Sequence, residues 1–238
     1  MHYSYFLYSI FFLLLLAIIL SLRRDLIKDA VPAFIFGAVG GPAMEVLYTR
    51  DYWHPPSVLR VGAVRIEDVI FGVAICGLTL VVYPFLFKKK LGPVHAGMDR
   101  HFRSFGTLGL MIAVTLLLFF VCHLDSVFAT AIATGVAWLL ICASGRRDLF
   151  LPGLISGGIF ALLATFVYGV FLNIFVSRSE LNQIWLLHRS GLGITILGKV
   201  PLSELVWFFG VSSFLSIFEL FVNKREYIPS VETTPTAE

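Results

Sequence analysis

The sequence predicts an all-α integral membrane protein with seven transmembrane helices, arranged as two parallel three-helix repeats joined by a linker helix (3+1+3). Three observations predict this fold: an apolar composition, seven apolar stretches and an internal similarity. Hydrophobic residues make up 58% of the 238 residues, charged residues 14%, and the mean hydropathy is +0.89. A soluble domain has about 25% charged residues. This composition argues against a soluble fold, intrinsic disorder and nucleic-acid binding, since the last two need charge.

The seven stretches follow one another along the whole chain. A bilayer core needs roughly 20 apolar residues per helix. The stretches that meet or approach this length are 4–22, 30–48, 66–87, 105–122, 125–143, 149–177 and 202–222. The sixth is long enough to tilt in the membrane or to project from it.

The spans divide the chain into four parts. Residues 1–88 form the first three-helix repeat, and 89–123 form a cytoplasmic loop and the linker helix. Residues 124–226 form the second three-helix repeat. The remainder, 227–238, contains Pro, Thr, Ser and Glu, and is predicted to be a disordered cytoplasmic tail.

Lysine and arginine in the loops predict the orientation. The loops after spans 1, 3, 5 and 7 carry twelve of these residues, and the other side carries six. Because positive loops stay in the cytoplasm, the N-terminus is expected outside and the C-terminus in the cytoplasm. We expect the membrane to be a bacterial or archaeal cell membrane, and the sequence leaves a homo-oligomer open.

Spans 2 and 6 resemble each other. Pro32 aligns with Pro152, Gly37 with Gly157 and Tyr48 with Tyr168, and a loop tryptophan follows each span, Trp53 and Trp185. A carboxylate then opens the next span in both repeats, at Glu67-Asp68 and at Glu204. An odd linker leaves two such repeats parallel, with sites expected between them.

Four carboxylates lie within spans, where charge is expensive and needs a reason. They are Glu45, Glu67, Asp68 and Glu204, and Glu219, near the end of the last span, is a weaker fifth candidate. All four are expected at the outer membrane side, with Asp68 and Glu204 facing each other across the pseudo-twofold axis. A desolvated carboxyl group can stay protonated near neutral pH and act as a general acid, while a second removes a proton. The structural alternative is that acids in a first turn complement the helix dipole.

Aromatic side chains near these acids are candidates for substrate binding. Phenylalanines can stabilise a cation through cation–π contact, although most pack or face lipid. Trp53 and Trp185 also fit membrane-interface anchors, and His54 is a candidate proton carrier or an ordinary loop residue. No nucleotide-binding or metal-binding spacing occurs, so no cofactor and no metal is expected.

These residues resemble the membrane-embedded lycopene cyclase domain family, in tandem fused form. One copy is carried by Glu45, Trp53 and the segment 66–71, and the other by Trp185 and the segment 201–208. The sequence departs from the family at four positions: Arg65 replaces a proline, Asp68 and Ser203 each replace a Glu, and Thr165 stands where the first copy has Glu45.

The resemblance implies an intramolecular lyase or isomerase of carotenoid biosynthesis that closes a ring on a lipophilic polyene or isoprenoid without net redox change. An acid protonates a terminal C=C, a carbocation forms, an internal double bond attacks it, and a base removes a proton. The expected catalytic residues are Asp68, Glu204 and Glu67. The expected substrate-binding residues are Glu45, Trp53, His54, Phe71, Trp185 and Trp207.

Two other functions are alternatives to the cyclase hypothesis. Small sugar transporters share a 3+1+3 plan, but the few Asn and Gln residues of these spans lie at the span edges. This argues against a sugar path and leaves a proton or lipid carrier open. A non-enzymatic membrane scaffold, with the acids as structural caps, is the third reading.

Overall fold

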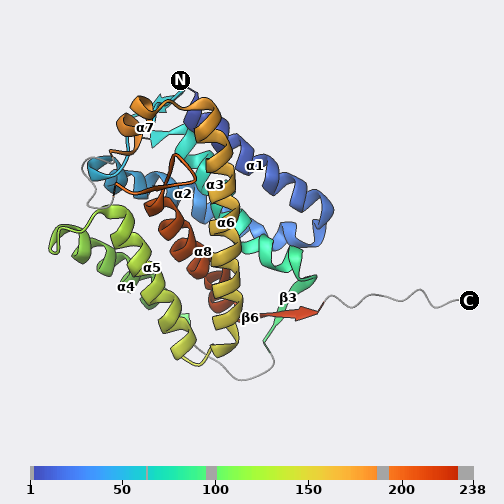
Figure 1. Ribbon diagram of the computed structural model, residues 1–238. Helices are drawn as coiled ribbons and strands as arrows, with labels where there is room; N and C mark the ends of the chain where they lie inside the picture. Colours follow the sequence, from blue (N-terminus) through green and yellow to red (C-terminus); the bar gives the residue numbers. More distant parts are fainter. Residues whose placement is uncertain (1–2, 63, 95–100, 187–192, 230–238) are drawn as a thin grey trace, which may run out of the picture.

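The computed structural model describes residues 3–62, 64–94, 101–186 and 193–229, and it is built mainly of α-helices (Figure 1). The long helices are α1 (Ser4–Leu22), α2 (Ile27–Asp51), α3 (Ile66–Leu86), α4 (His101–Phe120), α5 (Ser126–Ala143), α6 (Phe150–Phe175) and α8 (Leu202–Val222). A short helix, α7 (Arg178–Trp185), follows α6. Each of the seven long helices coincides with one predicted span to within a few residues.

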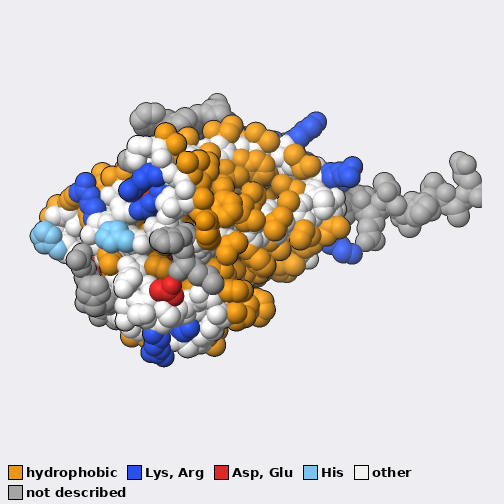
Figure 2. Space-filling view, turned by 90° about the horizontal axis from the view of Figure 1, so that it is seen from above, with side chains coloured by type: hydrophobic (Ala, Val, Ile, Leu, Met, Phe, Trp, Pro, Cys, Tyr) orange, Lys and Arg blue, Asp and Glu red, His pale blue; other side chains and the backbone are white. Residues whose placement is uncertain are grey.

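The chain is a multi-pass membrane protein. Six of its helices have the length and hydropathy needed to cross a bilayer. The helix at the position of the expected fourth span, α4, has a described apolar part of only Gly106–Phe120. Figure 2 shows broad apolar surface between Lys and Arg side chains at either end of the molecule.

Helices α3 and α8 lie at the centre and contact each other. Helices α1 and α2 pack on α3, α5 and α6 pack on α8, and α4 packs on α5. Small residues set the closest approaches: a Cβ on Gly37 would lie 2.1 Å from the carbonyl oxygen of Gly72, and one on Gly157 would lie 2.1 Å from Oγ of Ser213. Glycine lets membrane helices approach closely where lipid gives no hydrophobic drive to associate. The aligned glycines of spans 2 and 6 therefore have matching packing roles.

The turns before α2 and α6 share the sequence Arg-Arg-Asp-Leu, at 23–26 and 146–149. A 3-10 turn forms in each, η1 (Arg24–Leu26) and η2 (Arg147–Leu149). Arg23 pairs with Asp25 and donates to the carbonyls of Pro84 and Lys89. Arg146 pairs with Asp148 and donates to the carbonyls of Leu220 and Arg225. Arg23 thus links the turn before α2 to the end of α3, and Arg146 links the turn before α6 to the end of α8.

Beyond the ends of α3 and α8, strands β3 (Lys89–Pro93) and β6 (Arg225–Pro229) form an antiparallel ribbon. Its register is self-complementary: Lys89 pairs with Pro229, Pro93 with Arg225, and Leu91 with Tyr227 at the centre. The prediction of a disordered tail from residue 227 is therefore wrong for 227–229, because their backbone groups pair with β3. Residues 230–238 lie outside the described part of the chain, as do Arg100 and Arg189 of the orientation count.

Short hairpins precede both central helices. Strands β1 (Arg60–Val61) and β2 (Val64–Arg65) lead into α3, and β4 (Thr195–Ile196) and β5 (Val200–Pro201) lead into α8. The first amide of each helix bonds back across its hairpin, Ile66 to Leu59 and Leu202 to Ile194. The hairpins fix where each helix begins, and with it the direction of the acids in its first turn.

Candidate active site

Three of the span acids lie at one end of the bundle. Glu45 is in the last two turns of α2, and Asp68 and Glu204 are in the first turns of α3 and α8. Their exposed fractions are 8%, 1% and 6%. Buried carboxyl groups need hydrogen bonds or charge partners, and the two halves supply different ones.

In the first half, Arg65 joins Glu45 to Asp68. Its Nη1 lies 3.2 Å from Oε2 of Glu45 and 3.9 Å from Oδ1 of Asp68. Its backbone N–H donates to Asp68, as does the hydroxyl of Tyr5, and Trp53 Nε1 donates to Glu45. Arg65 lies in the connection between α2 and α3, yet it is only 6% exposed. The reason is the hairpin, which ends at Arg65 and turns its guanidinium toward α2.

In the second half, Glu204 has neutral partners. Tyr52 and Trp185 both donate to its Oε1 at 2.7 Å. The Tyr52 hydroxyl also lies 3.0 Å from Oγ of the neighbouring Ser203. Within the described part of the chain, Glu204 forms no ion pair with Lys, Arg or His. Its carboxyl group is therefore held by hydrogen bonds alone.

Glu67 has a different environment. It is fully buried, and its carboxylate accepts from Oγ of Ser57 and from the backbone N–H of Val58. Both carboxylate oxygens therefore hold the loop that leads from Trp53 to the hairpin. Glu67 lines neither of the cavities described next.

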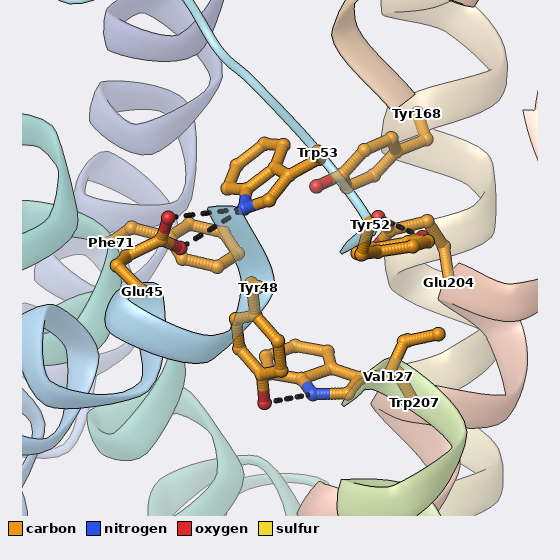
Figure 3. A pocket seen from close by; sticks show the side chains of 9 residues that line it. All are labelled: Glu45, Tyr48, Tyr52, Trp53, Phe71, Val127, Tyr168, Glu204 and Trp207. Atoms are coloured by element: carbon orange, nitrogen blue, oxygen red, sulfur yellow. Dashed lines mark hydrogen bonds between the residues drawn. The ribbon is translucent and has the colours of Figure 1, made fainter. Parts of the chain in front are cut away.

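Glu45 and Glu204 lie on opposite walls of a small pocket between the halves (Figure 3). We call it the acid pocket; its lining residues are Glu45, Tyr48, Tyr52, Trp53, Phe71, Val127, Tyr168, Glu204 and Trp207. Its volume of about 30 Å³ is enough for about one water molecule. The sequence led us to expect Asp68 opposite Glu204, but the acid that shares this pocket with Glu204 is Glu45.

A larger cavity of about 250 Å³ adjoins the acid pocket. The two share Glu45, Tyr48, Phe71 and Trp207, and this apolar cavity also reaches Asp68 and Tyr5. Away from the acids, its walls are mostly apolar side chains of α2, α4 and α8, such as Phe36, Met111 and Val211. Two carboxylates thus face a space suited to hydrocarbon.

The predicted aromatic residues divide between the cavities and their surroundings. Phe71 and Trp207 stack across the centre, with ring centroids 6.4 Å apart and an interplanar angle of 16°, and Trp207 donates to Tyr48. Trp53 lines the acid pocket, whereas Trp185 lies behind Glu204 and contacts the Trp53 ring. His54 is exposed, and its Nε2 lies 2.6 Å from the carbonyl of Thr49, so it lies outside both cavities.

Sequence reasoning missed the tyrosines of this site. Tyr5 and Tyr52 each donate to an acid, and Tyr168 lines the acid pocket. Tyr52 stands beside Trp53, and Tyr168 had been aligned with Tyr48, so the pattern signalled two of the three. Tyr5 gave no signal, because one tyrosine in an apolar first span is ordinary.

No group of three or more His, Cys, Asp or Glu side chains suited to a metal ion occurs among the described residues. Comparison of the chain with protein-family models, curated proteins and solved structures finds no match. The functional argument therefore depends on the geometry of this site.

Proposed function

We propose that the protein is a membrane-embedded cyclase that closes the end of a linear polyene or isoprenoid by acid–base catalysis. The observation that carries this proposal is the position of two buried carboxyl groups, Glu45 and Glu204, on opposite walls of one pocket, beside an apolar cavity within the membrane spans. A hydrocarbon substrate reaches such a site from the lipid. The resemblance to the lycopene cyclase domain family supports the same reaction class.

In this proposal, the end of the chain lies in the apolar cavity beside Phe71 and Trp207, which line both cavities. Glu204 donates a proton to the terminal C=C through the one water that the acid pocket accommodates, and an internal double bond attacks the resulting carbocation. Glu45 or Asp68, each within 4 Å of Arg65 Nη1, then takes a proton from a neighbouring carbon, and the ring double bond forms. One proton enters and one leaves, so the reaction needs no redox partner.

The aromatic walls suit the charge that develops. Faces of Phe, Tyr and Trp attract a cation within about 6 Å of the ring centroid. Phe71 and Trp207 border the path, and Tyr48 and Tyr168 complete the wall. A single water in the acid pocket would return the proton from Glu45 to Glu204 and reset the site for another cycle.

We also propose the finer membrane arrangement that the sequence predicts: two parallel three-helix repeats around the linker α4, with the N-terminus outside and the C-terminus in the cytoplasm. It is supported by the paired hairpins, the paired Arg-Arg-Asp-Leu turns and the excess of basic residues on one side. The acids would then lie near the outer surface of a bacterial or archaeal cell membrane.

The test is pigment analysis in a bacterial host that makes lycopene. The full chain and its Glu204→Gln and Asp68→Asn variants are expressed, membrane levels are matched, and extracted carotenoids are separated by chromatography. We expect new cyclic products from the full chain, and a loss of about 10²–10⁴-fold in Glu204→Gln, the usual contribution of a general acid. Unchanged lycopene with the protein well inserted would exclude lycopene as the substrate.

Activity that persists in both variants would exclude the acid–base mechanism. A chain that changes the distribution of a lipid or of protons across the membrane, without any new product, would favour a carrier. Each result therefore separates the cyclase from its competitors.

A further inference from the structure

A second cavity adjoins the apolar cavity on the side away from the acids. This second cavity of about 140 Å³, here called the far cavity, shares Phe36, Cys76 and Leu215 with the apolar cavity. Helices α2 and α8 form most of the walls of the far cavity and about half of those of the apolar cavity, where α3 and α4 supply most of the rest. Along α8 the lining residues run from Trp207 to Val222, and Asn223 follows directly after the helix.

The cavities together cover most of the depth of a membrane. From Trp207 to Asn223, a helix rise of 1.5 Å per residue gives a length of about 24 Å. The hydrocarbon core of a bilayer is roughly 30 Å thick. The space therefore suits a long, narrow molecule that lies parallel to α8.

The far cavity has one polar wall, Glu219. This side chain is 10% exposed, and its Oε1 accepts from Asn223 and lies 3.8 Å from Arg225 Nη1. Its Oε2 is buried and has no hydrogen-bond partner in the described part of the chain. Arg225 itself is paired with Asp29. The donors nearest to Glu219 are thus used on the other oxygen, and Oε2, which has almost no accessible surface, is left without a donor on a side chain that lines the far cavity.

We propose that the apolar cavity and the far cavity join into one space, the α2–α8 channel, which binds a linear isoprenoid alcohol lengthwise, with its hydrocarbon end next to the acid pocket and its hydroxyl group at Oε2 of Glu219. The inference deepens the proposed function, and rests on it only for the choice of the reacting end. A hydroxyl donates to the unsatisfied oxygen, which is otherwise buried without a hydrogen bond, an unfavourable state. Carboxylates at both ends of the channel disfavour an anionic lipid or fatty acid.

Gly40 makes room for this chain. It lines the apolar cavity, and a Cβ added there would have Phe36 ring atoms at 3.8 Å and 4.0 Å as its nearest contacts, so a larger side chain fits the helix and projects into the channel. Gly158 of α6 has nothing within 4 Å of an added Cβ and lines neither cavity. The two positions form a matched pair for blocking the channel.

The experiment measures binding to the purified full chain in detergent. The probes are radiolabelled geranylgeraniol, its parent hydrocarbon without the hydroxyl, and oleate as a lipid-derived anion. The variants are Gly40→Phe, Gly158→Phe and Glu219→Met. We expect geranylgeraniol to bind at least 10-fold more tightly than oleate, Gly40→Phe to weaken it at least 10-fold, and Gly158→Phe to change it less than twofold.

Glu219→Met tests the polar end. We expect it to weaken geranylgeraniol about fivefold or more and to leave the hydrocarbon within twofold. Equal losses for both probes, or none, would overturn the assignment of the hydroxyl to Glu219. If oleate bound more tightly than geranylgeraniol, the channel would be a binding site for anionic lipid instead. Equal effects of Gly40→Phe and Gly158→Phe on binding would overturn the proposal that the ligand occupies the channel.

Because this readout needs no turnover, it is independent of the proposed chemistry. Glu204→Gln should still bind geranylgeraniol if the channel is right. Binding of geranylgeraniol without cyclisation of lycopene would support the channel and contradict the cyclase function. Cyclisation of lycopene without binding of geranylgeraniol would support the cyclase function and contradict the channel.

Discussion

The two halves of the chain, α1 to β3 and α5 to β6, are alike at one end of the bundle and differ at the other. At the end with the ribbon, Arg23 and Arg146 make the same set of contacts to an aspartate and two carbonyls. At the end with the acids, the first half has an arginine and two carboxylates, and the second has Glu204 among neutral donors. The two ends therefore differ: the arginine contacts are repeated in both halves at one end, and the carboxyl groups have a cationic partner in one half and neutral donors in the other at the opposite end.

The largest expected loss of stability comes from removing Arg65, the cation that only the first half has beside its acids. Arg65→Met leaves Glu45 and Asp68 buried without their cation, and breaking a buried pair costs about 3–5 kcal/mol. Chemical unfolding in detergent measures the loss of stability. The neighbour across the hairpin, Arg60, is exposed, so Arg60→Met should change stability by less than about 0.5 kcal/mol. Similar stability of the two variants would contradict the role given to Arg65.

A smaller effect compares the glycine contacts of the halves. In Gly37→Ala the new methyl would lie 2.1 Å from the backbone carbonyl oxygen of Gly72, whereas in Gly157→Ala it would lie 2.1 Å from the movable hydroxyl of Ser213 and 2.8 Å from the carbonyl oxygen of Phe209. Overpacking costs about 1–3 kcal/mol, and we expect Gly37→Ala near the upper value and Gly157→Ala near the lower. Thermal unfolding of both, with Gly158→Ala as the open-space control, checks the order.

Arg23 and Arg146 allow a test of the similarity between the halves at the ribbon end. Both Arg23→Leu and Arg146→Leu remove hydrogen bonds from a charged donor, worth about 1.5–3 kcal/mol when buried. The Arg146 side chain is 5% exposed and that of Arg23 is 18%, so Arg146→Leu should cost more, about 2 kcal/mol against about 1. A larger loss of stability in Arg23→Leu than in Arg146→Leu would contradict the expectation that solvent exposure weakens the contacts of Arg23.

The smallest effect concerns the two tryptophans. Trp185→Phe removes a hydrogen bond of 2.7 Å to Glu204, and Trp53→Phe removes a longer contact of 3.1 Å to Glu45. We expect Trp185→Phe to lower stability by about 1 kcal/mol and Trp53→Phe by about 0.5 kcal/mol. The losses are small because the phenylalanine ring fills most of the space of the indole. Unfolding midpoints measured side by side test the order, and a greater loss at Trp53 would contradict it.

Much of the fold follows from the sequence, because a span is defined by length and apolar content alone. The start of α3 at Ile66 and of α8 at Leu202 were both predicted. The hairpins and the β3–β6 ribbon were not, since their strands are two to five residues long and depend on partners elsewhere in the chain. The Arg-Arg-Asp-Leu repeat was visible at 23–26 and 146–149, but its arginines were read only as charges that orient the helices.

The site was predicted in its acids and not in their pairing. Glu45, Asp68 and Glu204 stand out because charge in a span is expensive. Their neighbours depend on side-chain direction: the hairpin turns Arg65 inward, and Tyr52 crosses from the first half to reach Glu204. Neither contact has a signature in spacing, so the sequence alone led us to expect Asp68, and not Glu45, opposite Glu204.

The ribbon also bears on how such a chain is assembled. Because Leu91 and Tyr227 occupy equivalent places in the two halves and pair with each other, the register of β3 and β6 is that of a strand pairing with its own copy. Two identical subunits related by a twofold axis make contacts of this kind. The ribbon therefore has, within one chain, the pairing register of a symmetric dimer interface, whereas the acids at the other end have different partners in the two halves.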